Sequence, residues 1–426
     1  MSSADVQREF DVVIFGATGF TGQFVVEEIA RVVQKEHGIK WAIAGRNKSK
    51  LETVLKQASE VVGNDVTGTS IIIADVADEE SLLSMCRLTR MILNCVGPYR
   101  FFGEPVVKAC VEAGSHHLDI SGEPQFIETM QLKYHDAAQK AGCYIISTCG
   151  FDSIPADLGV IFTRDVFKGD LNSIEAYLSI NTGPEGGSWN YGTYQTAIHS
   201  VPHTRDELLF GKKLVSYEVP PPAHKATKRP QLFRGERVGS DWCVHFQGAD
   251  RSVVQRTQRF NYEQLKERPV QFNPFVRISS TFWLVIIALM TTIFSLLANF
   301  SFGRSLLEKY PKIFTLGYFS HEGPTKKQIE GSSFSWHFVG EGYETKIADP
   351  DQQHDDKPSK MIETRVCGPE PGYVTTPICL VAAAMTVLKE AEKMPLDGGV
   401  LTPGGAFRKT SLRDRLTEAG MKFEKL

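Results

Sequence analysis

Short apolar runs alternate with amphipathic stretches over the first 150 residues of the chain. The runs are four to seven residues long, as the buried strands of a parallel sheet are. They lie at 12–15, 41–45, 71–75, 91–97 and 144–148. The stretches between them have helical periodicity, for example over 23–33 and 48–58. This alternation predicts an α/β fold with a Rossmann-like doubly wound parallel sheet, which binds its ligand at the carboxyl ends of the strands.

The pattern changes after about residue 150. Alternating apolar and polar residues predict strands of a second, mixed or antiparallel sheet with a half-exposed face. These strands lie at 173–182, 331–345 and 360–368. Polar stretches at 219–237 and 348–360 predict loops, and a long helical pattern follows over 371–393.

One segment, 278–303, contains no charged residue. A helix of about 22 residues covers roughly 33 Å, close to the hydrocarbon thickness of a bilayer. A single crossing would separate the C-terminal elements from the globular body to which their pattern assigns them. Basic residues flank both ends, Arg277 and Arg304, so the charge bias gives no orientation. We therefore predict a re-entrant or interfacial anchor in one leaflet, with a buried core helix as the alternative.

Composition narrows the classes of function. The net charge of −3 provides no basic field for nucleic acid, so no nucleic-acid partner is expected. The eight cysteines are scattered without CxxC spacing, which predicts no metal site and favours a reducing compartment. The N-terminal residues lack an apolar core, so no secretory signal is expected.

Three glycines, Gly16, Gly19 and Gly22, follow the first apolar run at GxxGxxG spacing. A dinucleotide pyrophosphate requires this order of strand, glycine turn and helix. The first glycine permits the tight turn, the second lets the backbone approach the phosphates, and the third lets the helix lie close to the strand. The motif predicts a nucleotide site at the start of the helix; the alternative is a glycine turn that binds nothing.

The end of the second apolar run indicates which nicotinamide cofactor binds. An NAD site usually has an acidic residue there, which bonds the ribose 2′-hydroxyl. This chain has Arg46 instead, followed by Lys48 and Ser49, and an arginine can pair with a 2′-phosphate. The sequence therefore favours NADP, with NAD as the alternative. Asp75, at the end of the third run, is predicted either to face the adenine or to cap the helix that begins near Ala77.

The fourth run ends in Asn94 and continues into a Gly97-Pro98 turn and Tyr99. This turn is predicted to lie under the nicotinamide, with Asn94 and Tyr99 offering an amide and a phenol. A plain turn after a buried strand is the alternative. Two carboxylates and a hydroxyl follow the next short run, at Asp119, Ser121 and Glu123. They form either a polar wall of the site or a cap on the next helix.

Reduction of a carbonyl or enoyl group also needs a proton donor. The candidates are Tyr99, Asp119 and His117, because no Tyr-x-x-x-Lys dyad lies in a suitable place. His117 has the alternative of a strand-edge residue. Further along, Asp152 or Ser153 is predicted to cap a helix with Pro155 in its first turn, where the chain crosses into the second domain. A substrate contact at this crossing is a further interpretation.

With these residues collected, the chain resembles the saccharopine dehydrogenase family. The matching motifs are GATGFTG at 16–22, AGR at 44–46, NCVGPY at 94–99, DISGE at 119–123, GFDSIPAD at 150–157 and GGVLTPGGAF at 398–407. They span nearly the whole chain.

The resemblance implies a nicotinamide-dependent oxidoreductase and a domain order. A Rossmann domain would cover 1–150, an inserted α/β domain would cover 151–370 with the apolar segment, and 371–426 would return to the first domain. It also assigns phosphate binding to the three glycines. The loop amides would come from Thr18, Gly19, Phe20 and Thr21.

The apolar segment has no counterpart in the soluble lysine-pathway enzymes of this family, whereas bacterial relatives with a similar GGVLTP ending include trans-acting enoyl reductases of lipid assembly. We therefore predict an NAD(P)-dependent oxidoreductase that acts on an apolar or lipid-linked substrate. It would face the cytosol on a lipid droplet or an organelle membrane such as that of the mitochondrion. A catalytically silent nucleotide-binding scaffold and a true saccharopine dehydrogenase are the alternatives, and a homodimer stays open.

Overall fold

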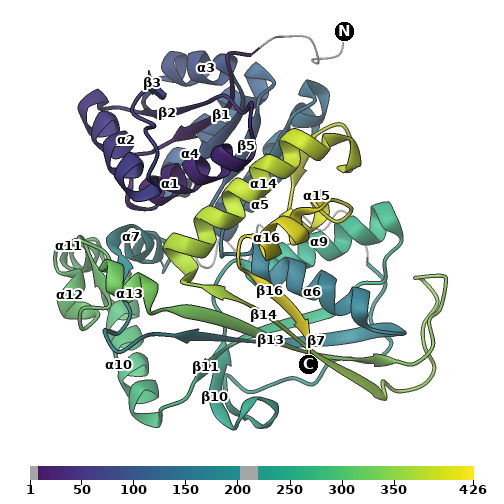
Figure 1. Ribbon diagram of the computed structural model, residues 1–426. Helices are drawn as coiled ribbons and strands as arrows, with labels where there is room; N and C mark the ends of the chain where they lie inside the picture. Colours follow the sequence, from purple (N-terminus) through teal and green to yellow (C-terminus); the bar gives the residue numbers. More distant parts are fainter. Residues whose placement is uncertain (1–7, 202–218) are drawn as a thin grey trace. The chain divides into compact units, whose positions relative to one another are not determined.

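The computed structural model describes residues 8–201 and 219–426, which divide into two compact units. The first unit holds the described residues up to Asp152 together with Gly372–Ala419. The second holds Ser153–Pro371 and Gly420–Leu426. In Figure 1 the purple strands and the yellow-green helix α14 thus belong to the same unit, although they lie far apart in the sequence. The prediction that the N-terminus carries no secretory signal concerns residues 1–7, which lie outside the described residues.

The first unit is built on a seven-stranded sheet in which every pairing is parallel, in the order β15-β6-β5-β4-β1-β2-β3. Its first six strands are β1 Phe10–Phe15, β2 Trp41–Gly45, β3 Ser70–Ile73, β4 Thr89–Asn94, β5 His116–Asp119 and β6 Tyr144–Ile146. The helices between them are α1 Phe20–Lys35, α2 Lys48–Val62, α3 Glu79–Leu88, α4 Tyr99–Ala113 and α5 Pro124–Ala141. The predicted Rossmann-like doubly wound sheet is confirmed.

The C-terminal part of the chain completes this unit. β15 Gly399–Leu401 pairs with β6, and α14 Thr376–Glu390 packs against α1. Almost every residue of α14 is buried, which explains its apolar composition as that of a core helix. The short helices α15 Pro403–Ala406 and α16 Leu412–Glu418 follow.

The second unit holds a mixed seven-stranded sheet in the order β16-β14-β13-β7-β11-β10-β9. Its strands are β7 Asp170–Asn181, β9 Leu232–Gly235, β10 Asp241–His245, β11 Gln271–Ile278, β13 Ser333–Tyr343, β14 Lys360–Pro369 and β16 Lys422–Lys425. Only the β7–β11 pairing is parallel, so the sheet is mixed. Helices α6 Ile154–Val166 and α9 Asp250–Leu265 pack against it.

Two expectations about segments of the second unit were wrong. The end of the stretch predicted as a loop at 219–237 forms β9, which pairs antiparallel with β10 through Leu232–Gly235. The last residues of the chain, expected to return to the first unit, instead form β16 at the edge of the second sheet, beside β14. Both strands have only four residues, so their apolar periodicity is too short to predict them.

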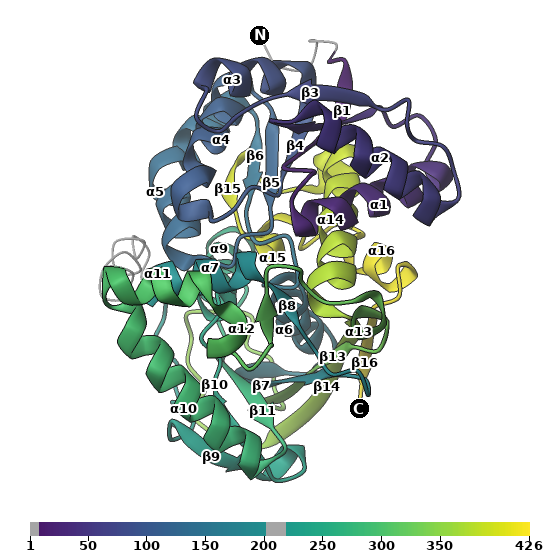
Figure 2. The ribbon, with the colours of Figure 1, turned by 90° about the vertical axis from the view of Figure 1, so that its left-hand side faces the viewer.

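The apolar segment forms α10 Thr281–Ala298, followed by α11 Ser301–Lys309 and α12 Pro311–Phe314. Figure 2 shows α10 on the outside of the second unit, near β10 and β11. Its C-terminal end packs against α7 Tyr191–Ser200. Ala298 is the only buried residue of α10, so the core-helix alternative is excluded. The remaining elements are α13 Lys326–Glu330 and the short parallel pair β8 Trp189–Asn190 and β12 Phe319–Ser320.

Candidate nucleotide site

The turn after β1 leaves no space for side chains at two of its glycines. Gly16 has a φ of +84°, and a Cβ there would lie 2.7 Å from Val96 Cγ2. A Cβ on Gly22 would lie 2.2 Å from the carbonyl oxygen of Gly16. Gly19 is the N-cap of α1, and no side chain caps this helix. The helix therefore begins at Phe20, three residues earlier than expected, with first-turn amides that can meet an anion.

A cavity of about 250 Å³ lies at this turn, and we call it the glycine-turn cavity. It is lined by Phe15, Gly16, Thr18, Gly19, Gly45, Arg46, Val76, Cys95, Val96, Gly97 and Phe102. Five of the predicted cofactor residues therefore meet here, Gly16, Thr18, Gly19, Arg46 and Gly97. Phe20, Thr21, Gly22, Asp75 and Asn94 are not among the lining residues. Their assigned contacts stay predictions.

The cavity also has lining residues that sequence reasoning missed. Phe102 belongs to the first turn of α4 and is partly exposed, and Val76 follows β3. Both are apolar side chains in positions where a nucleotide base or ring can stack or pack. The adjacent Phe101 and Phe102, two exposed aromatic residues at a helix start, were the signal in the sequence.

Arg46 is exposed and directly follows β2. Within the described part of the chain, its guanidinium forms no ion pair and no hydrogen bond, so it is available to an anionic ligand. The next residue, Asn47, caps α2 by accepting a hydrogen bond from the Lys50 N–H at 3.0 Å. A rigid helix start thus fixes the backbone beside Arg46.

Asp75 does not cap the next helix. Its carboxylate accepts the N–H of Ala77 at 3.1 Å, whereas Asp78 is the N-cap of α3 and accepts the N–H groups of Glu80 and Ser81. The helix begins two residues later than expected, because Asp78 places its carboxylate at the start of the amphipathic stretch. The predicted contact of Asp75 with an adenine stays a prediction.

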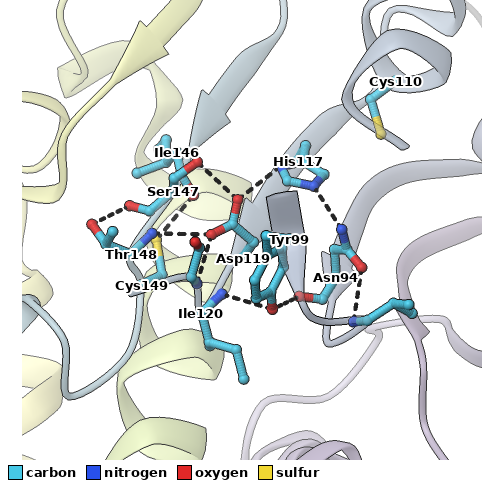
Figure 3. Close-up of polar contacts among 12 residues, drawn as sticks. Asn94, Tyr99, Cys110, His117, Asp119, Ile120, Ile146, Ser147, Thr148 and Cys149 are labelled. Carbon is cyan, nitrogen blue, oxygen red and sulfur yellow. Dashed lines mark hydrogen bonds and ion pairs between the residues drawn. The ribbon is translucent and has the colours of Figure 1, made fainter. Parts of the chain in front are cut away.

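The three candidates for proton transfer lie together in a buried polar cluster at the ends of β4, β5 and β6 (Figure 3). Asp119 lies at its centre and is fully buried. The Asp119 carboxylate accepts the N–H of Ser121 at 2.9 Å, the N–H of Thr148 at 3.1 Å and the hydroxyl of Ser147 at 2.8 Å. Burial raises the pKa of Asp119 to about 6, against the effect of these three donors.

His117 and Asn94 extend the cluster on the other side of Asp119 in Figure 3. His117 Nδ1 lies 3.7 Å from the Asp119 carboxylate, and Nε2 lies 3.3 Å from the Asn94 amide nitrogen. Burial lowers the pKa of His117 to about 3, so the imidazole is neutral at pH 7. The Asn94 side-chain oxygen accepts the N–H of Val96 at 3.0 Å. Asn94 therefore fixes the turn that lines the glycine-turn cavity.

Tyr99 is also turned into the protein. Its hydroxyl donates to the main-chain carbonyl of Asn94 at 2.8 Å, and burial raises its pKa well above the usual range. None of Tyr99, His117 and Asp119 lines the glycine-turn cavity. In the described structure the cluster holds the strand ends in place, and proton transfer by any of the three stays a prediction.

Glu123 has a role that differs from the expected cap on α5. It occupies the N-cap position of α5 without capping it, and its carboxylate instead accepts the N–H groups of Tyr99 at 2.7 Å and Arg100 at 3.1 Å. The Arg100 side chain adds a hydrogen bond from Nε at 3.2 Å. Glu123 thus caps α4 from another loop, a contact that sequence spacing does not show. The Ser121 hydroxyl accepts the N–H of Glu123, a residue that precedes α5, so this bond does not cap the helix either.

The crossing into the second unit also differs in detail. Ser153 is the N-cap residue of α6, but no side chain, from Asp152 or Ser153, makes the capping hydrogen bond. Pro155 lies in the first turn, as expected. Burial raises the pKa of Asp152 to about 6. Among the described residues, no group of three or more His, Cys, Asp or Glu is arranged to hold a metal ion.

Comparisons with known proteins agree with this geometry. The model of the saccharopine dehydrogenase NADP-binding domain matches residues 12–146. The chain is 45% identical to the human saccharopine dehydrogenase-like oxidoreductase, over 99% of this chain and 98% of that protein. A Caenorhabditis elegans protein named lipid droplet localized protein is 40% identical, over 97% and 98% of the two chains.

Among solved structures, the apo saccharopine dehydrogenase (L-Glu forming) of Saccharomyces cerevisiae is similar, with a TM-score of 0.55 over 98% of this chain and 100% of that chain. The identity is 12%, so this likeness shows the fold alone.

Proposed function

Because the chain belongs to the saccharopine dehydrogenase-like oxidoreductase family and carries its NADP-binding domain, we propose that it oxidises or reduces an apolar or lipid-linked substrate while attached to a lipid surface. Bound NADP(H) supplies or accepts the hydride. The observation that carries the proposal is the exposed apolar helix α10 on a chain that also holds a nucleotide site. The C. elegans relative, named for lipid droplets, supports the location.

The nucleotide would be held through the glycine turn. The amides of Thr18, Gly19, Phe20 and Thr21 would bind its phosphates, and Arg46 would pair with the 2′-phosphate. The fit rests on the conformation of Gly16, the uncapped start of α1 and the guanidinium of Arg46, which has no partner among the described residues. These features all belong to the first unit.

The exposure of α10 supports lipid attachment. Two helices in the described residues are long and apolar enough to cross a membrane. In the most apolar part of Pro371–Lys393, 83% of the residues are buried, whereas in Thr281–Ala298 only 6% are buried. Phe282, Leu289 and Leu296 are each more than 60% exposed. Soluble proteins rarely leave such a continuous apolar surface in water.

The way α10 is held favours a helix that lies in a lipid surface over one that spans it. At its N-terminal end, Trp242 donates a hydrogen bond from Nε1 to the Thr281 hydroxyl at 2.9 Å. At its C-terminal end, Phe294 and Ala298 pack with Tyr194 of α7. Both ends are thus attached to the second unit, which leaves the outer face between them to enter one leaflet.

Flotation with lipid tests the attachment. Leu289→Asp places a charge on the exposed face of α10, and we expect this variant to fold normally but to stay out of the floating fraction of phospholipid-coated triglyceride droplets. Phe294→Asp is the contrasting variant, because it damages packing against Tyr194 and should lower the thermal midpoint. Flotation of Leu289→Asp equal to that of the unmodified chain would contradict attachment through α10. Imaging of the tagged protein in cells would separate lipid droplets from mitochondria.

A second candidate function is a nucleotide-binding scaffold without turnover. It is favoured by the buried hydrogen bonds of Tyr99 and by the neutral, enclosed His117, because neither residue lines the glycine-turn cavity. Oxidation of NADPH in the presence of droplets loaded with lipid extract distinguishes the two functions. Substrate-dependent oxidation supports the enzyme, whereas tight NADPH binding without oxidation supports the scaffold. Saccharopine is tested in a separate assay with NADP+ or NAD+, because its oxidation, with transfer of its hydride to the oxidised nicotinamide, would identify the third alternative, a true saccharopine dehydrogenase.

A further inference from the structure

We propose that the second unit contains a binding site for a small organic anion, one with an oxyanion head, carboxylate or phosphate, and a short apolar body. The site is a cavity of about 280 Å³ that lies wholly within this unit, and we call it the arginine cavity. Its walls come from the start of β7, α9, the α9–β11 loop, the end of β13 and the segments 219–223 and 350–354. Nothing in the proposed oxidoreductase function assigns a role to it.

The lining of the arginine cavity carries two guanidinium groups and no carboxylate. It includes Arg259, Arg268 and His354, and no Asp or Glu is among the lining residues. The nearby carboxylate of Asp170 is already engaged. It accepts the N–H of Ile347 at 2.9 Å and bonds His354 Nε2 at 2.9 Å. An anion that enters the cavity therefore meets guanidinium groups without a competing carboxylate on the wall.

The two arginines retain unused hydrogen-bond donors. The Arg268 side chain is 14% exposed, donates from Nη2 to the carbonyl of Asp349 at 3.0 Å and places Nε 3.5 Å from the Asp170 carboxylate. Its buried Nε has no hydrogen-bond partner. Arg259 and Gln255, one turn apart on α9, have no hydrogen bond or ion pair with any described residue. A guanidinium fork of this kind suits a planar carboxylate or a phosphate.

The rest of the wall suits an apolar body. Tyr343 and His354, which both line the cavity, are stacked face to face, with ring centroids 3.8 Å apart and an angle of 5° between the planes. The Tyr343 hydroxyl is bonded to His224 Nδ1 at 2.9 Å, so its position is fixed. Prolines contribute much of the remaining lining, in 220–222 and at Pro269 and Pro350. The volume is near the lower end for ligand pockets, which favours a short-chain anion over a dinucleotide.

Calorimetry with the full chain tests this site. The probes are hexanoate and hexyl phosphate, which distinguish a carboxylate from a phosphate head, with hexanol as the neutral control. We expect saturable binding of at least one anion, about tenfold or more tighter than that of hexanol. Equal affinity for hexanol and both anions, or no binding of either anion, would overturn the proposal.

Variants connect the binding to the cavity. Arg259→Gln should weaken the anion about tenfold while leaving the thermal midpoint nearly unchanged, because this side chain forms no hydrogen bond or ion pair with any described residue. Arg268→Gln should also weaken the anion about tenfold. Its thermal midpoint is measured as well, because this variant loses the contact with Asp170. Arg251→Gln, on the exposed face of the same helix and outside the cavity, should bind as the unmodified chain does. Unchanged affinity in Arg259→Gln, or equal weakening in Arg251→Gln, would refute the site.

Discussion

Arg46 is the side chain on which the preference for a 2′-phosphate depends. We expect Arg46→Asp to weaken NADP binding about tenfold or more and to leave NAD binding nearly unchanged, because only NADP carries the phosphate that an arginine can pair with. Titration calorimetry with both cofactors measures the two changes. Lys56→Asp, an exposed charge on α2 outside the cavity, is the matched control. Equal loss of both cofactors in Arg46→Asp would contradict the assignment.

His117 makes the stability of the first unit depend on pH. Its pKa in the folded chain is lowered to about 3 by burial, below the ordinary value near 6.5. The unfolded chain therefore binds a proton that the folded chain does not, and stability is lost as pH falls below about 6.5. The test compares how far the free energy of unfolding falls between pH 7 and pH 5. We expect this fall to be about 2 kcal/mol smaller for His117→Gln than for the unmodified chain.

Urea unfolding at the two pH values measures this difference. The nearby Asp119 acts in the opposite direction, because burial raises its pKa to about 6, so its protonation favours the folded chain. Asp119 is present in both proteins, which makes the comparison report on the histidine. Parallel pH dependences would show that His117 is accessible to protons in the fold.

Sequence reasoning led to residues that lie together in the fold where a local motif sets the backbone. The glycine spacing led to Gly16 and Gly19, and the run after β2 led to Arg46, all of which line the glycine-turn cavity. It missed Phe102, and it misplaced the cap that Glu123 provides, because that contact joins residues 24 apart in the chain. Only the fold brings a carboxylate before α5 to the start of α4.

Helix α4 depends on this distant cap. Glu123 and Arg100 are almost fully buried, so Glu123→Ala would remove a buried ion pair and the carboxylate that accepts two N–H groups of α4. We expect a loss of about 3–5 kcal/mol in the free energy of unfolding. Denaturant titration measures it.

An exposed ion pair between α3 and α4 provides the control. Glu79 pairs with Lys108 of α4 at 2.9 Å, and both side chains are largely exposed. Glu79→Ala should therefore cost only about 0–1 kcal/mol. A similar loss in both variants would show that burial does not govern the strength of the Glu123 cap.

Elements were predictable where the sequence shows a clear apolar run or alternation. The five apolar runs of the first unit and the long strands β7, β13 and β14 fall close to the expected ranges. The short strands β9, β15 and β16 were not predicted, and neither were the longer β10 and β11. The exposure of α10 could not be derived from its composition either, since α14 is nearly as apolar and is buried.

At the scale of the whole molecule, the first unit depends on two separate stretches of the chain. Tyr373 places its ring 4.9 Å from that of Phe20 and 5.5 Å from that of Phe24, at the start of α1. We expect a chain truncated after Pro371 to lose NADP binding and cooperative unfolding, because it lacks α14, β15 and this aromatic contact.

Calorimetry and circular dichroism would report the effect of this truncation. Removal of 420–426 alone is the control. It deletes only β16, an edge strand of the second sheet, so NADP affinity should be unchanged. Full NADP binding by the chain that ends at Pro371 would show that α14 is dispensable for the nucleotide site.

The division of the first unit between both ends of the sequence sets an order of events during translation. The ribosome makes β1 to β6 first, then the second unit up to Pro371, then α14 and β15, and β16 of the second unit last. The nascent chain therefore exposes the apolar helix α10 while the parallel sheet of the first unit still lacks its last strand, β15. Helix α10 can therefore bind a lipid surface before the first unit is complete and can bind its nucleotide.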